Sequence, residues 1–126
     1  MADDTQEQPP GDEHAAPIEA FHRALAGVQL ERAQLDVAIR EHDWEDVEIA
    51  AGDAAMSWLA ASAACKQIAA RGRAGRLLAV PAKLTLHAAQ AALLDLFERA
   101  RRQSDSPRLH GALERYRSAI APDESP

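Results

Sequence analysis

WEDVEIAAGDAAMSWLAASAACKQI, residues 44–68, is the stretch that decides the fold. Its apolar residues recur at alternating steps of three and four, the spacing of a helix that packs along one seam. Asp43 stands before it as a helix cap, and acidic residues occupy the first turn, where the helix dipole favours them. The seam residues are Trp44, Val47, Ala51, Ala54, Trp58, Ala61, Cys65 and Ile68. We therefore predict a helix whose small central residues allow close packing.

A second helical pattern precedes this stretch. Pro17 suits the first position of a helix, where its missing N–H costs nothing. After it, apolar residues fall on steps of three, four or seven, at Ile18, Phe21, Leu25, Val28, Leu35 and Ile39. This predicts a helix of about 25 residues. We favour a turn at 41–43 because the cap at Asp43 is strong, although one continuous helix is the alternative.

The chain after residue 68 predicts a break and a third helix. Gly72 and Gly75 lie in an arginine-rich run that suits a helix end. The third helix is expected to begin between Leu77 and Pro81 and to end near Gln103. It has two apolar faces: one at Leu84, His87, Ala91 and Leu94, the other at Leu86, Ala89, Leu93, Leu96 and Ala100, with Phe97 between them. So wide an apolar arc predicts several neighbours or an exposed groove.

Ser106 and Pro107 then predict the start of a short fourth helix. Its apolar residues are Leu109, Leu113, Tyr116 and Ile120. A helix this short is marginal alone, so we expect it to dock on the others. The predicted fold is all-α: an antiparallel bundle of three long helices and a short C-terminal helix over residues 17–121. Residues 1–16 are expected to be a disordered acidic tail, and residues 122–126 a second disordered tail.

Composition narrows the function classes. Hydrophobic residues make up 47% of the chain and aromatic residues 4%, and 29 residues are alanine, so the core is built mainly from small and aliphatic side chains. The net charge is −6, but seven acids lie in the two tails and leave 14 basic residues against 13 acidic ones. That balance gives no electrostatic reason to bind nucleic acid.

The same sequence predicts a cytoplasmic protein. Cys65 is the only cysteine, so no internal disulfide forms. The N-terminal stretch lacks the basic and apolar regions of a secretory signal. No run approaches the roughly 18 uninterrupted apolar residues of a membrane span, so we expect no membrane partner.

Catalytic and metal patterns are absent from the sequence. The acids around His42 are explained by a helix start, without a metal. His87 lies mid-helix as in phosphorelay modules, but the lysine that such modules place after the histidine is missing. The arginines and glycines of residues 71–76 lack the Lys-Ser/Thr pair of a phosphate loop. We therefore predict no catalytic residue, no metal, no cofactor and no enzyme activity.

A family resemblance gives a more specific expectation. The segment 42–48, HDWEDVE, leading into 55–59, AMSWL, resembles the start of the second helix in bacterial flagellar export chaperones of the FliT type and in the related FlgN-like chaperones. The order and lengths of the predicted helices over residues 18–121 are also similar. The resemblance implies a cytoplasmic chaperone that sequesters the helical end of an exported flagellar subunit, such as a filament-cap or hook-junction protein.

The same resemblance implies a binding site. The partner-binding residues would be Leu86, Leu93, Leu94, Leu96 and Phe97, and the covering helix would use Leu109, Leu113, Tyr116 and Ile120. This hypothesis requires residues 77–103 to carry more apolar surface than one chain can cover. The alternative is a regulatory or assembly module that forms a homodimer through the seam of residues 44–68, with no chaperone role. An enzyme or phosphorelay carrier is a third, weaker reading.

Overall fold

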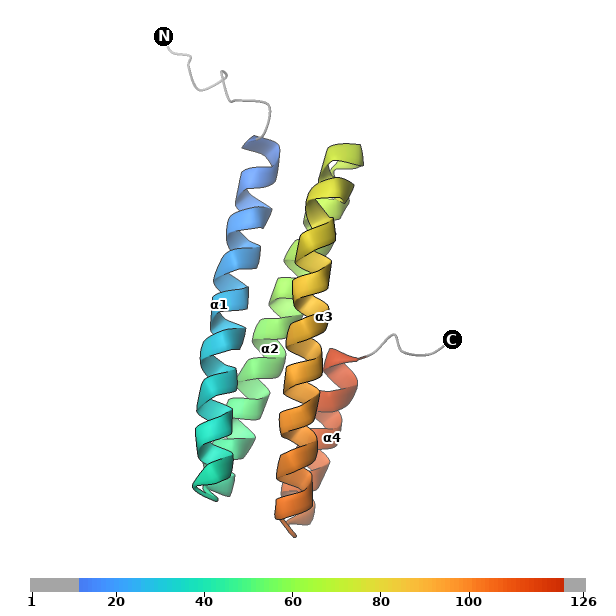
Figure 1. The fold of residues 1–126 in the computed structure, drawn as a ribbon. Helices are drawn as coiled ribbons and strands as arrows, with labels where there is room; N and C mark the ends of the chain where they lie inside the picture. The colour runs from blue at the N-terminus through green and yellow to red at the C-terminus, as the bar shows by residue number, and fades with distance from the viewer. Residues whose placement is uncertain (1–11, 122–126) are drawn as a thin grey trace.

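The structure is a computed structural model that describes residues 12–121 and consists of four helices (Figure 1). The helices are α1 (Asp12–Arg40), α2 (Trp44–Ala69), α3 (Gly72–Gln103) and α4 (Pro107–Ile120). The described part contains no strand, so the all-α prediction is confirmed. Of the tails predicted at 1–16 and 122–126, residues 1–11 and 122–126 lie outside the described residues.

Each helix runs opposite to the one before it, and α2 contacts the other three (Figure 1). α3 also touches α1 and α4. The core lies between these helices and is filled mainly by aliphatic side chains, together with Phe21, Trp58 and Phe97. Its largest fully buried members are Phe97, Leu35, Ile39, Leu93, Leu113, Ile120, Val28 and Val47. On α2 the central core positions Ala51, Ala54 and Ala61 are fully buried, so the neighbouring helices can approach this helix closely.

α1 begins five residues before the predicted start at Pro17. Residues 12–16 are helical, although the sequence suggested that they belong to the disordered tail. Alanines at 15 and 16 are the strongest helix formers. Pro17 comes just after the first turn, where it removes a single backbone hydrogen bond, so the helix extends through it.

The predicted turn between the first two helices is confirmed. Asp43 caps α2, and its side chain accepts a hydrogen bond from the backbone N–H of Asp46 at 3.2 Å. His42 takes the left-handed conformation with φ 57°, and the N–H of Asp43 reaches back to the carbonyl of Ala38 at 3.0 Å. Three residues are enough to reverse the chain.

The connection between α2 and α3 is tighter than predicted, because α3 starts at Gly72 and not between Leu77 and Pro81. Gly72 has φ 87°, a conformation that other residues rarely adopt. Gly75 passes so close to α2 that a Cβ atom there would overlap the carbonyl oxygen of Ile68. Pro81 lies exposed inside α3. The two glycines therefore build the corner, and Arg73 between them is already helical.

α4 is fastened to the second half of α3. Ser106 caps it by accepting from the N–H of Leu109 at 3.2 Å. The Nε2 atom of His110 reaches the carbonyl oxygen of Arg101 at 3.0 Å, near the end of α3. Ion pairs join Arg101 to Glu114 and Arg117 to Glu98 across the two helices. As a result, α4 runs beside the last turns of α3 and leaves its first half without a cover (Figure 1).

Candidate functional site

The α2 seam of residues 44–68 faces the interior of its own chain. All of its members are buried except Trp44, which is partly exposed. Trp58 also donates a hydrogen bond from Nε1 to the backbone carbonyl of Leu86 at 3.1 Å. In this fold the seam residues belong to the core of a single chain, so they are not open to a second copy; the homodimer itself stays a prediction.

The predicted partner-binding residues of α3 are enclosed too. The exposed fraction is 7% for Leu86 and Leu96 and 0% for Leu93 and Phe97, while Leu94 is partly buried. The prediction that these four side chains are open to a partner is wrong, because the other helices of the same chain cover this face. Of the predicted covering residues, Leu109, Leu113 and Ile120 are buried and Tyr116 is partly buried; a regulatory role for them stays a prediction.

The apolar surface that α3 leaves open lies in its first half. Leu77 is 68% exposed, Val80 51% and Leu84 66%. With the exposed His87 and Ala91 they follow steps of three and four along one outward face. We call Leu77, Val80, Leu84, His87 and Ala91 the α3 seam. The sequence predicts the second half of this seam, at Leu84, His87 and Ala91, as an apolar face, whereas the family resemblance implies a binding surface on the opposite face.

A comparison within α3 shows that this exposure is unusual. Residues 18 apart in a helix lie five turns apart and point in the same direction. Asp95 is 18 residues after Leu77, and Arg102 is 18 residues after Leu84, and both are exposed. The second half of α3 therefore presents charged side chains to water on the face where the first half presents leucines. Exposed apolar stripes of this kind are typical of interaction surfaces.

The hydropathy of α3 agrees with this view. Among the described helices, α3 alone is long and apolar enough to cross a membrane by length and composition, with a mean hydropathy of 1.4 over 18 residues. A single helix of this kind is weak evidence for a membrane span and bears neither for nor against the expected cytoplasmic location. Only 28% of that window is buried, however. Its apolar residues are therefore mostly not used for the core of this chain.

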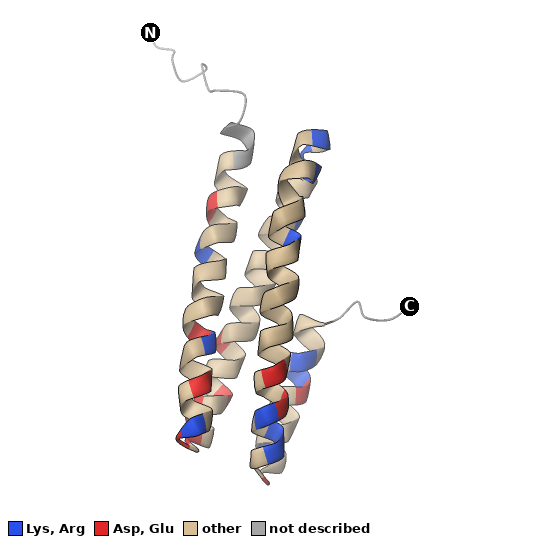
Figure 2. Ribbon diagram, viewed as in Figure 1, with Lys and Arg blue, Asp and Glu red and all other residues tan. Residues whose placement is uncertain are grey.

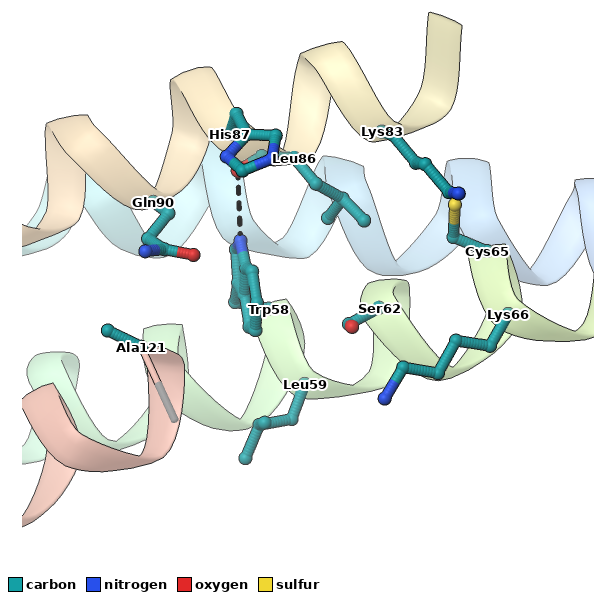
Figure 3. A pocket seen from close by; sticks show the side chains of 10 residues that line it. All are labelled: Trp58, Leu59, Ser62, Cys65, Lys66, Lys83, Leu86, His87, Gln90 and Ala121. Atoms are coloured by element: carbon teal, nitrogen blue, oxygen red, sulfur yellow. Dashed lines mark hydrogen bonds between the residues drawn. The ribbon is translucent and has the colours of Figure 1, made fainter. Parts of the chain in front are cut away.

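A groove beside the seam continues the open surface. It is a depression of about 390 Å³ between α2 and α3, at the point where α4 ends (Figure 3). Trp58 and Leu59 form its α2 wall, while His87 and Lys83 belong to α3. Its full lining is Trp58, Leu59, Ser62, Cys65, Lys66, Lys83, Leu86, His87, Gln90 and Ala121. Since His87 belongs to both the seam and the groove, one partner can contact both.

The thiol of Cys65 in the groove is not activated. Cys65 is 2% exposed, and its thiol points toward the carbonyl oxygen of Ala79 at 3.9 Å. Burial raises the pKa of this thiol, and the positive charge of Lys83 offsets the rise only in part. Cys65 is therefore a protonated thiol at neutral pH and a poor nucleophile. Within residues 12–121 no group of three His, Cys, Asp or Glu could hold a metal ion.

The charged residues in the open half of α3 are cations (Figure 2). Arg73, Arg76 and Lys83 are exposed on this helix. No Asp or Glu occurs between residues 54 and 94 of the sequence. The seam is thus an apolar stripe with Arg76 and Lys83 along one edge and Arg73 at its start.

No family model, curated protein or solved structure matches this chain. The similarity to flagellar export chaperones stays a prediction from the sequence.

Proposed function

We propose that this chain is a protein-binding module that holds an amphipathic helix of a partner on the α3 seam. The bundle of three long antiparallel helices and one short one serves as its scaffold. One observation carries the proposal: the outward face of α3 bears Leu77 and Leu84 where the same face, five turns later, bears Asp95 and Arg102. The second half of this outward face is charged and meets only water. The apolar first half of the same face therefore fits a surface that a partner covers.

The seam supports helix binding in coiled-coil geometry. Its alternating steps of three and four match the heptad spacing by which two helices interlock. Full burial of a leucine contributes about 1.5–3 kcal/mol, so Leu77 and Leu84 together offset much of the cost of association. The groove by Trp58 gives room for a side chain of the partner at the edge of the seam. Flanking cations favour a partner helix with acidic edges.

The flagellar chaperone is a narrower hypothesis, and we do not include it in this proposal. It relied on Leu93 and Phe97 being open, and both are fully enclosed. In this fold a client could reach them only after the helices that enclose them had moved apart. The proposed surface at residues 77–91 needs no such displacement.

A designed peptide tests the proposal without knowledge of the natural partner. The probe is a fluorescent 28-residue helix with leucines at heptad spacing and glutamates on both sides. We expect micromolar binding by fluorescence anisotropy, and a loss of about tenfold or more in Leu84→Asp, because the mutation places a charge in the apolar contact. A peptide in which lysines replace the glutamates should bind more weakly.

Leu30→Asp is the matched control. Leu30 is 61% exposed on α1, outside the seam and the groove, so this variant should bind the peptide as the unmodified chain does. Unfolding curves establish that both variants are folded. Equal affinity of the Leu84 and Leu30 variants, or no binding by the unmodified chain, would rule out the seam as a helix-binding surface.

A further inference from the structure

A second apolar surface lies on α2. Ile49 is 58% exposed and Met56 66%, and the two are seven residues apart, two turns along the same face. Shallow depressions of about 500 Å³ and 680 Å³ flank them, one toward α1 and the other toward α4. This α2 face, defined by Ile49 and Met56, points away from the core that the α2 seam enters.

The α2 face is acidic. Glu45, Asp46 and Asp53 are exposed around Ile49, and Arg108 of α4 is the one cation that lines either depression. α2 carries no Lys or Arg before Lys66. The pKa of Asp46 is raised, first by a hydrogen bond with the Asp43 side chain and then by the negative charge of Asp43, with Glu45 and Glu41 adding to it. The acids beside the α2 face are opposite in charge to the cations beside the α3 seam. The two apolar surfaces are therefore complementary in charge.

The α3 seam and the α2 face therefore match in chemistry and cannot meet inside one chain. They belong to different helices, both face away from the shared core, and they lie at different heights of the bundle (Figure 1). Contact between two α3 seams would bring Arg73, Arg76 and Lys83 of both copies together. Contact between two α2 faces would do the same for their acids. Like charges at an interface cost several kcal/mol, so both symmetric pairings are disfavoured.

We infer that the occupant of the α3 seam is the α2 face of a second copy of this chain. Leu77 and Leu84 of one copy pack against Ile49 and Met56 of the next, and Lys83 lies near Asp53 of that copy. A contact between two different surfaces leaves one of each free at the ends, so further copies add head to tail. This inference rests on the proposed function of the seam and names its partner.

Sedimentation velocity of the full chain tests the inference. The mass should grow beyond twice 13.6 kDa as the concentration rises, and added salt should reverse this growth because exposed charges are screened. Leu84→Glu and Met56→Lys should each remain monomeric, because each lacks one of the two surfaces. Mixed in equal amounts, they should form a pair of two chains and nothing larger, since each variant supplies the surface that the other lacks.

A charge exchange tests the geometry. Lys83→Glu should weaken association about tenfold or more through repulsion from the acidic face. The double variant Lys83→Glu/Asp53→Lys should recover part of the affinity, because every contact between its copies then pairs the exchanged charges. The control Leu30→Glu should assemble as the unmodified chain does.

Three results would each overturn the inference. The first is a chain that stays monomeric at all concentrations up to millimolar, and the second is a mixture of Leu84→Glu and Met56→Lys that stays monomeric. The third is a chain that binds phosphatidylglycerol vesicles through Leu84 but does not associate with itself. The designed peptide separates this failure from that of the proposed function. If the peptide still binds at the seam while the chain stays monomeric, the seam binds helices but its partner is a different protein.

Discussion

The two halves of α3 differ in what covers them. In the second half, α4 and its ion pairs lie against the helix, the leucines are enclosed and the outward face is charged. In the first half there is no α4, and leucines stand on the outward face with cations around them. One chain therefore covers the apolar residues of the second half of α3 but leaves those of the outward first half exposed. This exposed apolar half is the surface that we propose a partner covers.

This difference also explains why the sequence alone does not show which face of α3 is open to a partner. Periodicity identifies apolar faces, but it does not say which face meets the rest of the chain. Leu93 and Leu84 have the same residue type and belong to two faces of the same helix. Only the positions of α2 and α4 decide that the first is enclosed and the second is open.

The largest expected effect is a change in stability that separates the two faces. Phe97→Ala should lower the free energy of unfolding by about 3–5 kcal/mol, because it leaves a cavity at a fully buried site. Leu77→Ala, at an open site on the same helix, should change it by less than about 0.5 kcal/mol. Urea unfolding measures both. Similar losses in the two variants would mean that the first half of α3 is covered within the chain.

A smaller effect tests how firmly α4 holds its half. Ser106→Ala removes the cap that accepts from Leu109 N–H and should cost about 1 kcal/mol. The control is Ser118→Ala, an exposed serine inside α4 that should be nearly neutral. Hydrogen exchange of the α4 amides should become faster in the first variant alone. If α4 exchanges freely already in the unmodified chain, the covered half is not stably covered.

The smallest effect concerns the interior of the open half. Because burial raises the pKa of Cys65, alkylation by iodoacetamide should be slower in the folded chain than in urea and should need a higher pH. The folded state holds the thiol proton more tightly, so this stabilising contribution is complete below the unfolded pKa and falls as the pH rises through the folded pKa. Lys83→Ala should shift the alkylation profile to still higher pH. If Cys65 is alkylated as fast in the folded chain as in urea, the α2 seam around it is open to solvent as well.

Much of the fold follows from local chemistry. Asp43 and Ser106 mark helix starts by side-chain hydrogen bonds within three residues, and such signals are visible in a sequence. The corner at Gly72 and the early start of α1 are less visible. The corner depends on how close α3 comes to α2, and the start of α1 depends on how far the helix extends before Pro17. Neither feature is encoded by a single motif.

The candidate site was predicted only in part. The sequence indicated that α3 has more apolar surface than one contact needs, and the exposed Leu84, His87 and Ala91 agree with that. It did not place Leu77 or Val80 in that surface, because the predicted helix started too late to include them with certainty. Nor did it show the groove beside Trp58, which forms only because α4 is short.

The corner between α2 and α3 places a strict condition on any relative of this protein. Gly75 sits in an alanine-rich chain, yet even an alanine methyl group would overlap the carbonyl oxygen of Ile68. When related sequences are aligned, we expect this column to hold glycine wherever the two-residue connection is kept. The neighbouring position 74 is exposed, so its residue type should vary among relatives. A relative with a larger residue at 75 should also have an insertion in the connection between the two helices.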